Sequence, residues 1–275
     1  MRAGRAGRLA VLLAVSTIVA ACSGDVVGTG GAAPAATGTT APTVAGAELA
    51  GRWAHYDIVA YQGSPMKTMI ISYGFTDFAV EGDRLIESEE FCHADQVTDQ
   101  PIKTSISDAG TRAIKPVSTP VEVSGEAGAR RVLRPGTPTP VGIRLADPAN
   151  EALPTDPRDP RIVDDDGDGK PGITVVVHFG EAGDGELYLA RREIFAYDMV
   201  QDGPDSLRGT VKDSSEQLVV GASLSILENT DANWAQVPDR SLSPILLQRV
   251  GRDWDCDRLM AERGRLFPPD PGIGW

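Results

Sequence analysis

Four aspartates are crowded into the stretch VDDDGDGKPG, residues 163–172, directly before an apolar run. Asp164, Asp166 and Asp168 alternate along it, with glycines that allow a tight turn. Carboxylates this close raise one another's pKa and loosen the loop unless a cation neutralises them. Hard cations take six to eight oxygen ligands, which closely spaced carboxylates supply. The spacing therefore predicts a cation site, against the alternative of a solvated Asp/Gly-rich turn.

The loop resembles the Asp-x-Asp-x-Asp-Gly calcium loops of EF-hand, dockerin and integrin-repeat proteins. The resemblance places Asp164, Asp166 and Asp168 at ligand positions 1, 3 and 5, and Gly169 at the sharp turn of position 6. Lys170, at position 7, would contribute only its backbone carbonyl. We therefore expect Ca²⁺ as a structural rather than a catalytic ion.

The loop departs from these families at two later positions. Val175 stands where EF-hands have a bidentate glutamate, and Gly172 stands where integrin-type loops have aspartate. A strand rather than a helix follows Pro171. Water or distant groups such as Asp159 or Glu181 would complete the shell, and we expect weak affinity, with a Kd of about 10⁻⁴ to 10⁻³ M.

Few other residues are placed for chemistry. His55 and Asp57 share one face of a predicted strand, as a base and its orienting group would, but a surface contact is the expected role. His93 and His178 are expected to be structural. The sequence has no nucleophile elbow, no His-Glu-x-x-His motif and no phosphate loop. Core packing, rather than sugar binding, is expected for Trp53, Trp234, Trp254 and Trp275.

The N-terminus carries three arginines and then an apolar segment, Leu9 to Val19, too short to span a membrane. It ends in Val19-Ala20-Ala21-Cys22, which resembles the lipobox of bacterial lipoproteins. The resemblance implies that residues 1–21 are a signal peptide, removed by cleavage before Cys22. It also implies diacylglycerol on the Cys22 sulfur and an acyl chain, such as palmitate, on its amine, which together anchor the protein to a membrane.

Residues 22–46 then form a tether rich in Gly, Ala, Thr and Pro, too polar and irregular to fold. The folded domain is predicted over 47–275, outside the cytoplasm in the cell envelope. Ser23, rather than Asp, follows the cysteine, which under the lipoprotein sorting rule favours the outer membrane in a cell that has one. No later segment is apolar for long enough to form a transmembrane helix.

Charge narrows the range of partners. The formal net charge is −13 at pH 7, and without residues 1–21, which hold three of the 26 basic side chains, 23 basic side chains face 39 acidic ones. This balance opposes binding to nucleic acid or to anionic lipid and favours attraction of cations. We expect a monomer that binds no nucleic acid.

The body shows the alternation of β-strands more than the period of helices. Residues 215–229 keep apolar side chains on one parity, and 173–180 is nearly continuous and β-branched. Eight or more such strands joined by turns predict an all-β domain, a single antiparallel barrel or sandwich. Residues 116–160 hold nine prolines and are expected to be a long irregular excursion or a pair of weak edge strands. A short C-terminal helix is predicted in RDWDCDRLMAERGRL, stopping at Gly264.

Cys92 and Cys256 remain once Cys22 is lipidated. An even pair of cysteines in an exported protein favours a disulfide over two buried thiols. Such a bridge would pin the C-terminal helix to an early strand within one domain.

Gly51-Arg52-Trp53, at the start of the first predicted strand, resembles the Gly-x-Trp opening of lipocalins. Thr76-Asp77-Phe78 resembles the second lipocalin motif but lies much earlier than in that family. The resemblance implies an eight-stranded up-and-down barrel with a cavity for an apolar ligand, and it assigns no ligand-binding residue here. We therefore expect a non-catalytic lipoprotein that binds a small apolar ligand or an envelope protein. The alternatives are a cell-envelope hydrolase and a structural spacer.

Overall fold

The computed structural model describes residues 44–63, 66–228 and 234–275. The predicted signal peptide, Cys22 and all but the last three residues of the tether therefore lie outside the described residues. Residues Pro42–Trp275 form one compact unit. The hydrophobic clusters of the described residues are built from side chains of this unit. Most of the described chain is antiparallel sheet, which confirms the all-β prediction.

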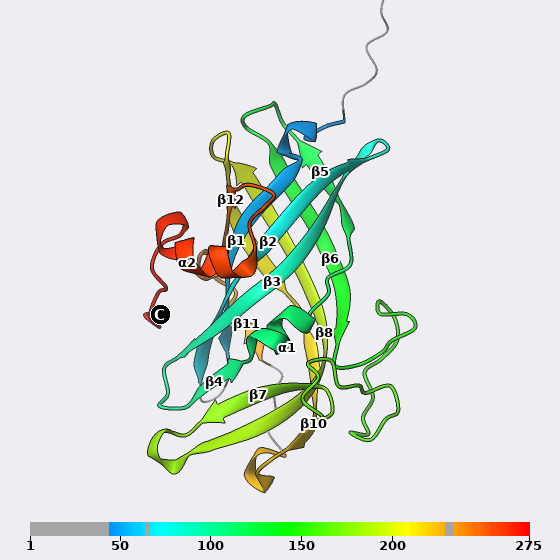
Figure 1. The fold of residues 1–275 in the computed structure, drawn as a ribbon, viewed down its shortest axis with the longest axis vertical. Coiled ribbons are helices and arrows are strands. Elements are labelled where there is room, and N and C mark those ends of the chain that lie inside the picture. The colour runs from blue at the N-terminus through cyan, green and yellow to red at the C-terminus, as the bar shows by residue number, and fades with distance from the viewer. Residues whose placement is uncertain (1–43, 64–65, 229–233) are drawn as a thin grey trace, which may run out of the picture. The chain divides into compact units, whose positions relative to one another are not determined.

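Eight strands of the described chain close into a ring, which the chain visits in sequence order (Figure 1). Each strand is antiparallel to both neighbours, and the last closes the ring against the first. The sheet is therefore a closed ring and not a sandwich. The ring consists of β1 (Gly51–Gln62), β2 (Lys67–Glu81), β3 (Arg84–Thr98), β5 (Thr119–Ser124), β6 (Arg131–Val141), β8 (Asp184–Gln201), β9 (Ser206–Asp213) and β12 (Pro244–Arg249).

The ring is irregular where the proline-rich stretch begins. β5 and β6 pair only over 122–124 and 131–133, whereas β6 pairs with β8 along almost its whole length. Pro138 and Pro140 lie in the part of β6 that β5 does not reach. Proline lacks an N–H group, so such a free strand edge tolerates it. Thr119–Ser124 and Arg131–Val141 are thus a pair of partly paired strands, in line with the alternative of weak edge strands, and the irregular excursion runs over 142–172, later than the sequence predicts.

Three further strands extend the same sheet at one end of the ring. The first half of β8 leaves the ring and pairs with β7 (Ile173–His178) and β10 (Glu216–Ala222), and β4 (Lys103–Ile106) adds to β7. β10 ends at Ala222, so the strand predicted over 215–229 is shorter than expected. Ser225–Leu227 forms a 3-10 helix instead, in which the Ile226 side chain is 81% exposed.

Alternate residues of β1 serve two different cores. Trp53, Val59 and Tyr61 point into the ring and pack with side chains of β8, β9 and β12. Tyr56, on the opposite face, packs outside the ring against the C-terminal segment, where it stacks on Phe267. Because both faces are covered, β1 is buried along most of its length. The Trp53 ring is fully buried, as core packing predicts.

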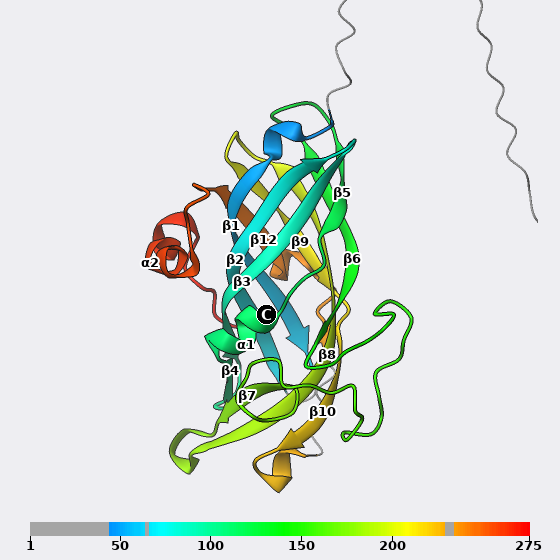
Figure 2. The same ribbon diagram turned by 45° about the vertical axis from the view of Figure 1, so that its right-hand side comes forward.

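The C-terminal helix α2 (Cys256–Leu266) lies outside the ring against β2 and β3 (Figure 2). Asp255 caps its first turn by accepting a hydrogen bond from the Arg258 N–H. The helix continues past Gly264, the predicted stop, and ends before Pro268-Pro269, which cannot extend it. Cys256 is joined to Cys92 of β3 in a disulfide, as predicted.

The remaining elements are short. Helix α1 (Asp108–Ala113) packs on β3 and is capped by the Ser107 hydroxyl, which accepts a hydrogen bond from the Gly110 N–H. Strand β11 (Ala235–Gln236) pairs with the end of β1. The 3-10 helices of the described chain are Ala47–Leu49, Gly180–Ala182, Ser225–Leu227 and Arg240–Leu242.

Candidate functional site

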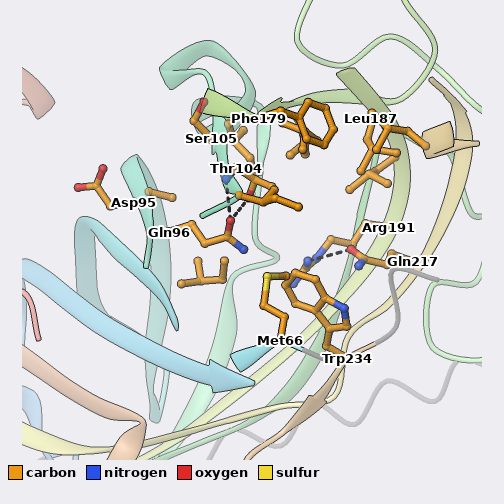
Figure 3. A pocket seen from close by; sticks show the side chains of 18 residues that line it. Met66, Asp95, Gln96, Thr104, Ser105, Phe179, Leu187, Arg191, Gln217 and Trp234 are labelled. Atoms are coloured by element: carbon orange, nitrogen blue, oxygen red, sulfur yellow. Dashed lines mark hydrogen bonds between the residues drawn. The ribbon is translucent and has the colours of Figure 1, made fainter. Parts of the chain in front are cut away.

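An apolar cavity of about 320 Å³ opens where β4, β7 and β10 extend the ring. Figure 3 shows Phe179 and Leu187 facing Met66 and Trp234 across it. A cavity of this size lies at the lower end of the range for small-molecule sites, which are mostly apolar with a few placed polar groups. Its apolar wall includes Ile70, Ile106, Val175, Val177, Leu187 and Leu189.

The walls of this outer cavity are held by side-chain contacts as well as by strand pairing. The Thr104 N–H of β4 donates to the Gln96 side-chain oxygen of β3 at 2.9 Å. β4 and β3 share no ladder, so this bond links the two strands. At the inner end, the Arg191 guanidinium donates to the Gln217 side-chain oxygen at 3.2 Å (Figure 3). The cavity thus ends in polar groups after an apolar wall.

A second cavity of about 100 Å³ lies deeper within the ring. It adjoins the outer cavity, because Ile70, Ala94, Ile106 and Arg191 line both. The inner cavity is also mostly apolar, but three carboxyl groups and three aromatic rings belong to its wall. Its lining includes Asp57, Tyr61, Phe91, Glu193, Phe195 and Asp213.

The charged groups of the inner cavity come from three strands. Arg191 and Glu193, both on β8, form an ion pair with 3.1 Å between Nε and Oε1. Their side chains keep 24% and 20% of their surface accessible, so they face the cavity. The Tyr61 hydroxyl donates to Asp213 at 2.8 Å across the ring. Burial raises the pKa of Asp57, Tyr61 and Glu193, and the charge of Asp213 adds to the rise in each, although His55 opposes it at Asp57 and Arg191 opposes it at Glu193.

A further ionic cluster is fully buried near the middle of the ring. Arg134 of β6 donates to Glu87 of β3 at 2.8 Å and lies 3.3 Å from Glu89. None of the three side chains is more than 1% exposed. One guanidinium cannot neutralise two carboxylates, and burial together with the Glu87 charge raises the pKa of Glu89 to about 8. The cluster is therefore one in which Glu89 holds a proton at neutral pH.

His55 and Asp57 are inside the ring, not on the surface, so the expected surface contact is wrong. His55 Nε2 lies 2.9 Å from Asp57 Oδ1, and its Nδ1 lies 2.9 Å from the Thr76 hydroxyl. The arrangement resembles a hydroxyl, a base and an orienting carboxylate. Thr76 has no exposed surface and His55 only 1%, so a substrate cannot reach the hydroxyl.

The other two histidines contact carboxylates near the surface. His93 lies 2.8 Å from Asp108, which joins α1 to β3. His178 lies 2.9 Å from Asp184 in the hairpin between β7 and β8. These contacts agree with structural roles for both histidines.

The acidic loop brings the three predicted ligands together. One ligand oxygen from each of Asp164, Asp166 and Asp168 lies within 4.8 Å of the others. The Asp164 carboxylate accepts hydrogen bonds from the Gly167 and Gly169 N–H groups at 2.7 and 2.8 Å. One oxygen of Asp166 is buried and has no hydrogen-bond partner within the described residues. Three oxygens are thus placed where a cation could bind them.

Neighbouring charges fix the rest of the loop. Asp165, the fourth aspartate, turns away and forms two hydrogen bonds with the Arg144 guanidinium, at 2.5 and 3.0 Å. The Lys170 ammonium binds Glu186 at 2.6 Å and lies 3.7 Å from Asp168. The hydrogen bond from the Thr174 hydroxyl, together with the N–H and ammonium groups of Lys170, lowers the pKa of Asp168. Burial raises the pKa of Asp166.

Apart from His55 and Asp57, the charged residues of the ring interior were not selected by the sequence analysis, although a pattern marks them. In β3, Glu87 and Glu89 share the parity of the apolar Leu85 and Phe91. In β8, Arg191 and Glu193 likewise interrupt a run of alternate apolar residues. A charge on the apolar face of a strand is costly unless it finds a partner inside.

No protein-family model matches the sequence, and no curated protein and no solved structure is significantly similar to it. No helix in the described part of the chain is long and apolar enough to cross a bilayer. The lipobox and lipocalin resemblances therefore stay predictions. The function is argued from the ring and its cavities.

Proposed function

We propose that this protein binds a small apolar ligand in the outer cavity and acts without catalysis. The observation that carries the proposal is the cavity of about 320 Å³, with its apolar wall and the polar groups at its inner end. The buried position of Thr76 and His55 favours a binder over the hydrolase alternative. The second cavity that adjoins it within the ring favours a binder over a structural spacer.

Binding of the neutral fluorophore N-phenyl-1-naphthylamine tests this proposal on protein lacking residues 1–22. Transfer of the dye from water to the apolar cavity should raise its emission in a saturable way. Ala94→Phe should weaken binding at least tenfold, because Ala94 lines both cavities where they meet. Ala79→Phe, on the exposed far part of β2, is the matched control and should bind normally. An absence of saturable binding to the unaltered protein would overturn the proposal.

The protein is further proposed to be held on the outer side of a membrane by lipid on Cys22. The sequence Val19-Ala20-Ala21-Cys22 supports this location, as does the disulfide between Cys92 and Cys256, which forms outside the reducing cytoplasm. In the native bacterium, mass spectrometry should find an N-terminal peptide that begins at Cys22 and carries lipid. A Cys22→Ser variant that fractionates with membranes exactly as the unaltered protein does would contradict it.

The acidic loop is proposed to hold a structural Ca²⁺. The clustering of three carboxylates and the unpartnered oxygen of Asp166 support this assignment. Millimolar Ca²⁺ should raise the melting temperature of the unaltered protein. Asp166→Ala combined with Asp168→Ala should abolish the rise, whereas Asp165→Ala, which loses only contacts outside the cluster, should keep it. An equal rise in the double variant would refute the site.

A further inference from the structure

The inner cavity has more negative than positive groups. Three carboxyl groups, those of Asp57, Glu193 and Asp213, line it, and Arg191 is the basic side chain of its described wall. Arg191 is already engaged by Glu193 and by the Gln217 side chain. Next to this wall, His55 contacts Asp57 and Arg134 binds Glu87 and Glu89. Asp213 accepts hydrogen bonds from the neutral Tyr61 and Ser215 hydroxyls, so within the described wall its charge is not balanced by an ion pair. A buried group of carboxylates is stable only when protons or cations neutralise it.

Aromatic rings complete the inner wall. Phe91, Phe195 and Tyr61 line the same space as the carboxyl groups. The face of an aromatic ring attracts a cation, and carboxylates beside such rings add direct charge attraction. The combination of rings and acids is therefore suited to an ammonium group rather than to a carboxylate or a phosphate.

The two cavities lie next to each other. Ile70, Ala94, Ile106 and Arg191 line both, so a ligand that spans the two cavities would pass between these side chains. An alkyl chain in the outer cavity would bury its methylenes, at about 0.8 kcal/mol each. A small head group attached to that chain would then lie in the inner cavity, within reach of Glu193 and Asp213.

We propose that the ligand is a cationic amphiphile, with its apolar chain in the outer cavity and its ammonium group among Glu193, Asp213 and the aromatic rings of the inner cavity. This inference rests on the proposed binding function and adds the charge of the ligand. An anionic amphiphile of the same length would meet Arg191 but would also face three carboxyl groups. Burial raises the pKa of Glu193, and the charges of Asp213 and Asp57 add to the rise while Arg191 opposes it, in agreement with a wall in which carboxyl groups outnumber basic side chains.

Three ligands of one chain length separate charge from apolarity. Octylammonium, octanol and octanoate would each be titrated against the bound N-phenyl-1-naphthylamine at pH 8, below their micellar concentrations. Octylammonium should displace the dye at a concentration at least tenfold lower than octanol, and octanoate should be weaker than octanol. Equal displacement by octylammonium and octanol, or stronger displacement by octanoate, would overturn the charge assignment while leaving apolar binding intact. Failure of the dye itself to bind would instead contradict the proposed function.

Two variants locate the charge effect. Glu193→Gln and Asp213→Asn should each reduce the preference for octylammonium over octanol at least threefold, without changing the affinity for octanol. Asp83→Asn removes an exposed carboxylate at the far turn between β2 and β3 and should leave the preference unchanged. The ligand series on the unaltered protein decides the proposal even where a variant does not fold. An unchanged preference in both folded variants would overturn the assignment of the site.

Discussion

Arg134, Glu87 and Glu89 show how one residue inside the ring supports others. Arg134→Met should cost about 3–5 kcal/mol of unfolding free energy, because it leaves two carboxyl groups buried without a cation. Arg131→Met, on the same strand, breaks a pair with Asp198 in which the arginine side chain is 58% exposed, and should cost far less because solvent screens the pair. Urea unfolding at pH 7 measures the loss of unfolding free energy in each variant. Equal losses would show that the buried cluster stabilises the fold no more than the exposed pair does.

The proton on Glu89 links stability to pH. The pKa of Glu89 is about 8 in the folded protein and 4.5 in its ordinary state, so between these values the folded state holds a proton that the unfolded state releases. This group therefore makes stability fall as pH rises from 4.5 to 8, by at most about 1.4 kcal/mol per pH unit. Its stabilising contribution is complete below pH 4.5 and lost above pH 8.

The variant Glu89→Gln is neutral at every pH and lacks this dependence. Its unfolding free energy relative to the unaltered protein should therefore increase between pH 5 and pH 8. Urea unfolding at pH 5, 6.5 and 8 gives the comparison, which cancels the titration of groups common to both proteins. Parallel pH profiles for the two proteins would mean that Glu89 is ionised in the folded state.

At the scale of elements, helix α2 contains a glycine that its geometry does not need. The helix passes through Gly264, and an added Cβ there would meet nothing within 4 Å. Gly264→Ala should therefore raise the unfolding free energy by about 0.5–1 kcal/mol through reduced backbone entropy. Gly209→Ala on β9 is the contrasting change, because its Cβ would collide with the Asp198 carbonyl of β8. A loss of stability in Gly264→Ala, measured by thermal and urea unfolding, would contradict the prediction.

Helix α2 and strand β6 show why sequence patterns predict only part of the fold. The predicted helix is found because its acidic first turn and basic last turn are local signals. Its end is missed because Gly264 tolerates helical geometry, and the following prolines decide the stop. For β6 the sequence leaves an irregular excursion and a weak edge strand both open, since Pro138 and Pro140 argue against a strand unless one edge is unpaired. That free edge depends on how far β5 extends, which no local pattern shows.

Over the whole molecule, the disulfide joins segments that are 164 residues apart in sequence. Opening so large a loop should lower the unfolding free energy by up to about 5 kcal/mol on the chain-entropy model. The double variant Cys92→Ser, Cys256→Ser should unfold at lower urea concentration than the oxidised protein. Reduction of the unaltered protein should give the same shift. Unequal shifts would indicate that the serine hydroxyls disturb the packing of α2 on β3.

The sequence by itself determines the features that depend on local order. Strand alternation, hairpin turns, the C-terminal helix and the pairing of Cys92 with Cys256 can all be predicted from it. The clustering of Asp164, Asp166 and Asp168 is likewise local, because five residues of loop cannot separate them far.

Only the tertiary structure decides what lies inside the ring. His55 and Asp57 are two residues apart, yet their burial depends on ring closure between β12 and β1. Glu193 and Asp213 come to one cavity because β8 and β9 each contribute one face to the interior. A strand's sequence shows that a charged residue shares its apolar face, but not which charged residues of other strands it will contact. Those contacts depend on strand register and on closure of the ring, which are set by residues distant in sequence.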